Sequence, residues 1–221
     1  MKVHAVAFAS LIALTGSAGA AQIDWNTWSS TTAGSIATTG GPVGVAFSGP
    51  SVSVQTPYPS YMPASTFADG TIVANAPVNT NGIMQLTGGS DALNTVTFAT
   101  AVVDPVMAIW SLGQGGINAQ FAFTNATPIF VSGGPSNEYG GAPISVSGNT
   151  VFGAEGNGTV QFLGTYTSIS WTNPVFENWY GFDVGIAGVA PAVPEPGTYA
   201  LMLAGLSVVG FMARRRRRPQ G

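Results

Sequence analysis

The acidic side chains have the widest chemical range of the residues in this chain. Between Gln22 and Val193 the sequence has eight Asp or Glu residues and no Lys, Arg, His or Cys. Histidine acid–base catalysis, lysine Schiff-base chemistry and thiol chemistry are therefore excluded from this segment. Carboxylate chemistry remains, such as the pair of acids that a glycoside hydrolase holds about 5 to 9.5 Å apart. The candidates for such a pair are Glu138, Glu155, Glu177 and Asp183.

Calcium binding is a second use for the same acids. Ca²⁺ takes about 6 to 8 oxygen ligands from carboxylates, amides and backbone carbonyls. Glu138 and Glu155 lie in oxygen-rich, Gly-rich segments, and neither segment matches the twelve-residue EF-hand loop. We predict these two residues as candidate calcium ligands and expect no other cofactor. The alternative is that they are solvated loop acids that keep the protein soluble.

Tryptophan side chains suit glycan binding, because a flat aromatic ring can cover the apolar face of a sugar. In a strand through residues 179–184, alternate residues share a face. That alternation leaves Trp179 and Asp183 as a candidate exposed pair, and Trp25 and Trp28 are further glycan-binding candidates. The residues assigned to the core instead are Trp110, Trp171, Tyr180, Phe182 and Val184.

The charge of the central segment excludes one class of partner. Residues 22–193 carry a formal charge of −8. A segment without a single cation cannot neutralise phosphates, so we expect no nucleic-acid binding.

The sequence predicts that the elements which position these side chains are β-strands. Short runs with alternating apolar residues, as in 51–54, 117–123 and 160–162, are separated by Gly-rich turns. This pattern predicts an all-β domain, an antiparallel β-sandwich of jelly-roll type, over residues 21–190. We do not expect an enzyme, and a carboxylate-dependent glycoside hydrolase is the alternative.

The first 20 residues have the features of a secretory signal peptide. Lys2 precedes an apolar stretch, and small residues follow at Ala18 and Ala20, as signal peptidase requires. We predict cleavage after Ala20.

The C-terminal end predicts a membrane anchor. Residues 197–213 are apolar or small throughout and would rise about 25 Å as a helix, close to the thickness of a bilayer core. The basic tail 214–221 follows, with Arg214, Arg215, Arg216, Arg217 and Arg218 in succession. These arginines predict a cytoplasmic C-terminus, with the domain on the outer side of the membrane.

The linker 191–196 completes a recognisable arrangement. Pro194, Glu195 and Pro196, followed by a short apolar helix and an arginine cluster, resemble the PEP-CTERM sorting signal of Gram-negative, exopolysaccharide-producing bacteria. The resemblance implies an exosortase that processes the tail. It also implies an inner-membrane precursor with a periplasmic domain, which becomes a cell-surface or extracellular protein.

From these features we expect a structural protein of the cell surface or extracellular matrix, associated with exopolysaccharide or biofilm. A carbohydrate- or calcium-binding module is the alternative. The expected partners are signal peptidase, the exosortase, the membrane before processing, and exopolysaccharide.

Overall fold

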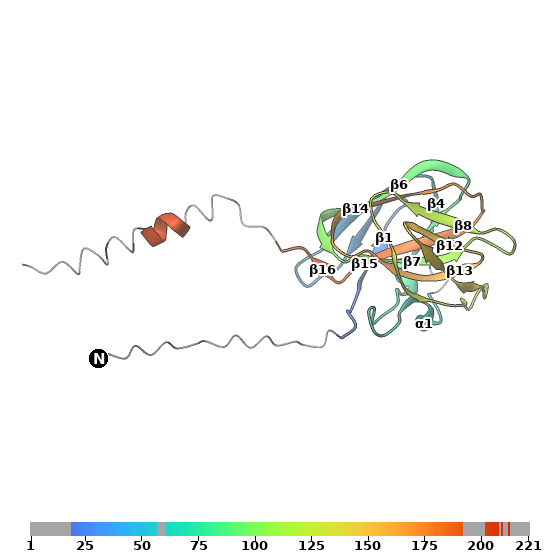
Figure 1. The fold of residues 1–221 in the computed structure, drawn as a ribbon, viewed down its shortest axis with the longest axis horizontal. Helices are drawn as coiled ribbons and strands as arrows, with labels where there is room; N and C mark the ends of the chain where they lie inside the picture. Colours follow the sequence, from blue (N-terminus) through green and yellow to red (C-terminus); the bar gives the residue numbers. More distant parts are fainter. Residues whose placement is uncertain (1–18, 57–60, 192–201, 208, 210–211, 213–221) are drawn as a thin grey trace, which may run out of the picture. The chain divides into compact units, whose positions relative to one another are not determined.

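The computed structural model describes residues 19–56, 61–191, 202–207, 209 and 212. The chain divides into two units, Met1–Val189 and Ala190–Gly221. The first unit consists mainly of β-strands, with a single turn of helix at α1 (Ala64–Phe67) and a 3₁₀ turn at η1 (Asn79–Asn81) (Figure 1).

Two groups of strands face each other across the core. The first group contains β4 (Ser51–Gln55), β5 (Ile83–Leu86), β7 (Val106–Leu112), β9 (Ile129–Gly133), β10 (Ala142–Pro143), β13 (Gly156–Gln161) and β15 (Tyr180–Ile186). The second contains β2 (Ala33–Ile36), β3 (Val43–Ser48), β6 (Ser90–Val103), β8 (Ala119–Phe123), β11 (Ser145–Ser147), β12 (Thr150–Gly153), β14 (Thr165–Asn173) and β16 (Gly188–Val189).

Strand β1 (Asp24–Trp28) joins the two groups. Its first residues pair with β15, and its last three pair with β2. The main path of pairing is therefore continuous, in the order β10-β13-β7-β15-β1-β2-β3-β6-β14-β8-β12-β11. Among the pairings of these described strands, only β10 with β13 is parallel.

The predicted all-β, antiparallel class is confirmed, with a refinement. Instead of two separate sheets, as in a jelly-roll sandwich, the strands form one sheet that curls until it nearly closes into a barrel. The reason is that β1 is long enough to pair first with one layer and then with the other.

An aromatic cluster fills the interior between the two groups of strands. Trp171 stacks on Phe121 with ring centroids 5.5 Å apart, and Phe182 meets Trp171 edge-on at 5.0 Å. Trp171, Tyr180, Phe182 and Val184 are all fully buried here, which confirms their predicted place in the core.

Strands β7 and β15 are buried at every position. Their inner faces contribute to the aromatic cluster, and their outer faces lie under a second cluster that includes Tyr61, Phe67 and Trp110. The hydroxyl of Thr159 donates a 2.8 Å hydrogen bond to the carbonyl of Phe67, which ties α1 to β13. The connection between β4 and β5 therefore covers the outer face of the sheet.

The second unit contributes only a few described residues. Residues 202–207, 209 and 212 are helical, and their side chains are exposed. No helix within the described residues is long and apolar enough to span a membrane. Most of the predicted helix 197–213 and all of Arg214–Arg218 lie outside the described residues, as do Pro194, Glu195, Pro196 and Ala18 of the predicted processing signals.

Candidate functional site

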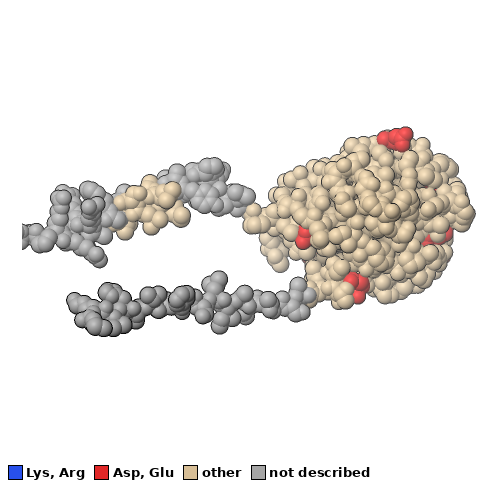
Figure 2. Space-filling model, viewed as in Figure 1, with Lys and Arg blue, Asp and Glu red and all other residues tan. Residues whose placement is uncertain are grey.

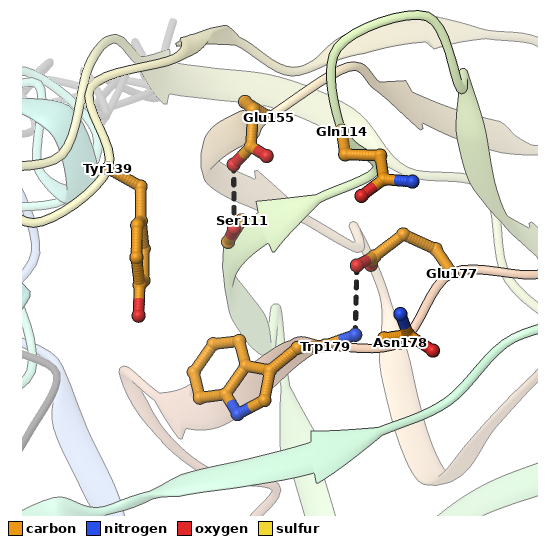
Figure 3. Close-up of a pocket in the computed structure, with 7 residues that line it drawn as sticks. All are labelled: Ser111, Gln114, Tyr139, Glu155, Glu177, Asn178 and Trp179. Carbon is orange, nitrogen blue, oxygen red and sulfur yellow. Dashed lines mark hydrogen bonds between the residues drawn. The ribbon is translucent and has the colours of Figure 1, made fainter.

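A pocket of about 310 Å³ opens on the first unit, at one end of β7 and β15 (Figure 3). Four separate segments contribute to it: the end of β7 with its following turn, the β9–β10 loop, the β12–β13 turn and the β14–β15 loop. The residues that line it are Ser111, Gln114, Tyr139, Glu155, Glu177, Asn178 and Trp179. Two carboxyl groups, two carboxamides and two aromatic rings thus meet in one cavity.

Glu155 and Ser111 form the first carboxylate position. The Ser111 hydroxyl donates a 2.9 Å hydrogen bond to Oε2 of Glu155. Both residues have left-handed backbone conformations, with φ of 59° at Glu155 and 52° at Ser111. Such conformations are costly for residues with a side chain, and they concentrate at functional sites. Two of them in hydrogen-bonded neighbours single out this part of the pocket.

Asn157 holds the two strained residues in place. Its Oδ1 accepts the Ser111 backbone N–H at 2.8 Å, and its Nδ2 donates to the carbonyls of Gly140 and Glu155 at 3.1 Å each. The side chain is buried and is hydrogen-bonded to the backbone of two residues that line the pocket, Ser111 and Glu155. One carboxamide therefore connects β7, the β9–β10 loop and the β12–β13 turn.

We expect Asn157→Ala to lower the free energy of unfolding by about 1 to 3 kcal/mol, because the buried N–H of Ser111 loses its acceptor, whereas the carbonyls of Gly140 and Glu155 keep the backbone N–H groups of Ser136 and Ala142. Urea denaturation followed by circular dichroism measures the loss. The matched control is Asn178→Ala, which removes an exposed carboxamide and should change the stability by less than about 0.5 kcal/mol. Equal stabilities for the two variants would contradict the role given to Asn157.

Glu177 forms the second carboxylate position and is buried, with 4% of its surface exposed. Its Oε1 accepts the Trp179 backbone N–H at 2.8 Å, while Oε2 has no hydrogen-bond partner in the described structure. Burial, together with the negative charge of Glu155, raises the pKa of Glu177 to about 7. Backbone N–H groups, that of Trp179 first, act against this rise in pKa. Near neutral pH, Glu177 therefore exchanges between an acid and a carboxylate.

The aromatic side of the pocket is formed by Trp179 and Tyr139. Both rings pack edge-on against buried Trp110, with centroid distances of 4.7 Å and 5.2 Å. Figure 3 shows Tyr139 and Trp179 on one side of the pocket, with Glu155 and Glu177 on the other side. Trp110 is fully buried, as the sequence predicted, and it fixes the two rings that line the cavity.

The structure places some predicted glycan-binding residues in the pocket and buries others. Trp179 is half-buried and lines the cavity. The prediction that Asp183 forms an exposed pair with it is wrong, because the outer face of β15 is covered and Asp183 has no exposed surface. Trp25 and Trp28 are 7% and 5% exposed, so they are core residues and present no face for a sugar.

The two candidate calcium ligands are divided between the pocket and its surroundings. Glu155 lines the pocket, whereas Glu138 is half-buried outside the set of lining residues. Within the described residues, no group of three or more His, Cys, Asp or Glu side chains could hold a metal ion. The acid that shares the pocket with Glu155 is Glu177, which sequence reasoning had considered only for catalysis.

The described surface of the domain carries few charged residues. Figure 2 shows scattered acidic residues and no lysine or arginine on the visible face of the described structure. All six basic residues lie at Lys2 and Arg214–Arg218, outside the described residues. The described surface of the domain therefore has carboxylates as its charged groups, among uncharged polar and some apolar side chains.

The first unit is thus an acidic, nearly closed β-domain with one carboxylate- and aromatic-lined pocket among its described features. The end of the chain identifies how it is handled: a family model described as the PEP-CTERM protein-sorting motif matches residues 192–218. The resemblance drawn from Pro194, Glu195, Pro196 and the arginine cluster is confirmed. No curated protein and no solved structure matches the chain.

The sorting motif defines the route of this protein. It indicates secretion, membrane anchoring before processing, and processing by an exosortase-type enzyme that yields an extracellular product. The motif covers only the tail, so the activity of the β-domain must be argued from its pocket.

Proposed function

We propose that this protein is a component of the cell surface or extracellular matrix that binds exopolysaccharide through the pocket of its β-domain and does not turn it over. The precursor lies in the inner membrane with its domain on the periplasmic side, and the processed form acts outside the cell. One observation carries the proposal. Trp179 and Tyr139 line a cavity whose other side chains are carboxamides, a hydroxyl and carboxylates.

This combination matches the chemistry of a sugar. Aromatic rings cover the apolar face of a pyranose, while amide and carboxylate groups pair with its hydroxyls and fix its orientation. Gln114 and Asn178 are exposed at the pocket and can serve as both donors and acceptors. A soluble acidic surface without cations also suits a protein that works among hydrated polysaccharide.

We expect Trp179→Ala to abolish retention of the protein on exopolysaccharide isolated from its host, because the variant loses the ring that a sugar would cover. Co-sedimentation of the purified full chain, solubilised in detergent, with the polysaccharide measures this. The matched control is Phe176→Ala, which removes an exposed aromatic ring outside the pocket. Equal retention of both variants would contradict glycan binding in the pocket.

The second candidate function is glycoside hydrolysis, and the Glu155–Glu177 pair favours it. A buried acid with a pKa of about 7 beside a second carboxylate is a pattern that glycosidases use for general acid catalysis. The co-sedimentation mixtures give the test. If new reducing ends appear with the native chain and not with Glu177→Gln, the function is hydrolysis of the polysaccharide rather than binding alone.

A further inference from the structure

The pocket has negative groups and no positive one. Glu155 and Glu177 both line it, and the sequence from Gln22 to Val193 offers no Lys, Arg or His that could approach them. Burying a carboxylate without a compensating partner is costly. Oε2 of Glu177 is buried in this way, since it has no hydrogen-bond partner in the described structure. A proton on Glu177 relieves part of this cost near neutral pH, and a positively charged ligand group would relieve it while Glu177 stays ionised.

The aromatic side of the pocket also favours a positively charged ligand. A cation is attracted to the face of a tryptophan or tyrosine ring, and most strongly where water is excluded. Trp179 and Tyr139 lie 6.5 Å apart between ring centroids, and both are held by buried Trp110. A small cation in the pocket would thus lie between the two rings and the two carboxylates that Figure 3 places around the cavity.

We propose that the pocket recognises the protonated amine of an amino sugar, so that the glycan it binds contains hexosamine units with free rather than acetylated amino groups. This inference rests on the glycan binding proposed above and names the chemical group of the glycan that the pocket recognises. An ammonium group has three N–H donors. The carboxylates of Glu177 and Glu155, which both line the pocket, can accept two of them, and the carboxamide oxygen of Gln114 or Asn178 can accept the third.

Competing ligands fit the pocket less well. An acidic sugar would add negative charge to a domain that already has a formal charge of −8. A neutral sugar would leave Glu155 and Glu177 without a counter-charge. A bare metal ion would find only two acidic ligands in the pocket. The raised pKa of Glu177 agrees with the inference, because burial and the charge of Glu155 both raise it and an ammonium group would lower it again.

The test compares two ligands that differ only in acetylation. The full chain in detergent is titrated by calorimetry with a glucosamine tetramer and with the matching N-acetylglucosamine tetramer. We expect the free-amine tetramer to bind about ten- to a hundredfold more tightly, as one charge-assisted hydrogen bond is worth that much. Glu177→Gln should remove most of this preference. Because the variant replaces a buried acid by a neutral side chain of the same shape, it should fold like the native chain.

The control variant is Asp91→Asn, which removes one exposed negative charge outside the pocket and should keep the preference. The other outcomes would refute either the amine inference or the proposed glycan binding. Equal binding of both tetramers refutes the amine inference and leaves glycan binding intact. Failure of both tetramers, together with lost co-sedimentation, refutes glycan binding itself. A lysine peptide that binds as tightly as the amine tetramer refutes recognition of a sugar.

Discussion

Replacing Trp171 by alanine is expected to remove about 3 to 5 kcal/mol from the free energy of unfolding, the largest loss for a single side chain in this domain. The indole is fully buried and meets Phe121, Phe123 and Phe182 at centroid distances of 5.0 to 5.9 Å. Its deletion leaves a cavity at the centre of the aromatic cluster. Small domains have about 5 to 15 kcal/mol of stability in total, so this loss is a large fraction of it.

The indole N–H of Trp171 also donates a 3.0 Å hydrogen bond to Oδ1 of Asn173. That oxygen keeps its second donor, the Asn94 side chain at 2.9 Å, so the loss in Trp171→Ala is mainly one of packing. Urea denaturation followed by far-ultraviolet circular dichroism measures the change. Trp171→Phe, which retains one ring, is the conservative control and should lose less than half as much. A loss below about 1 kcal/mol for Trp171→Ala would show that the cluster is not the core.

The sequence predicted the inner face of the sheet because that face has a simple period. Ala119, Phe121 and Phe123 alternate with partly exposed residues along β8, and Tyr180, Phe182 and Val184 occupy one face of β15. In both strands the face with the larger apolar side chains points inward, as hydrophobic burial requires.

The outer face of β15 could not be predicted in the same way. Alternation shows that Asp183 lies opposite Phe182, but it does not show what covers that side. The cover comes from Tyr61, Phe67 and Val73, which lie between β4 and β5 in the sequence. Asp183 and Trp25 were therefore expected at the surface and are buried.

The pairing of Glu155 with Glu177 was hidden for a related reason. The two residues lie in separate turns, and only the folded sheet brings the β12–β13 turn next to the β14–β15 loop. The sequence contained one signal: Glu155 is followed by Gly156, Asn157 and Gly158, residue types that favour tight turns. It gave no signal for the left-handed backbone at Ser111 or for the partner of either carboxylate.

Asp183 leads to the prediction with the largest pH dependence. Its side chain has no exposed surface, Nδ2 of Asn26 donates to its Oδ1 at 3.3 Å, and its Oδ2 has no partner in the described structure. Burial raises the pKa of Asp183 well above its usual range, while the Val184 backbone N–H and the side chains of Asn26 and Trp28 act against the rise. The folded domain therefore holds a neutral Asp183 at pH values where the unfolded chain ionises it. A proton on Oδ2 also suits Oδ1 of Asn26, a buried acceptor without a donor.

Because the folded pKa lies above the unfolded value, the stabilisation is complete below about pH 4 and is lost as the pH rises toward the folded pKa. The loss is at most about 1.4 kcal/mol per pH unit for each such group, and Glu177 adds to it between pH 4.5 and about 7. The Asp183→Asn side chain stays neutral at every pH. We expect this variant to be no more stable than the native chain at pH 4 and more stable than the native chain at pH 8. Urea denaturation at a series of pH values measures this crossing.

General repulsion among eight acids without a cation would also weaken the fold as the pH rises, so the control must remove a charge without removing a buried acid. Asp91→Asn does this at an exposed position and should leave the slope of stability against pH nearly as it is in the native chain. If Asp183→Asn and Asp91→Asn flatten the slope equally, repulsion across the surface explains the pH dependence. If only Asp183→Asn flattens it, the buried neutral Asp183 on the outer face of β15 is what makes this domain most stable in acid.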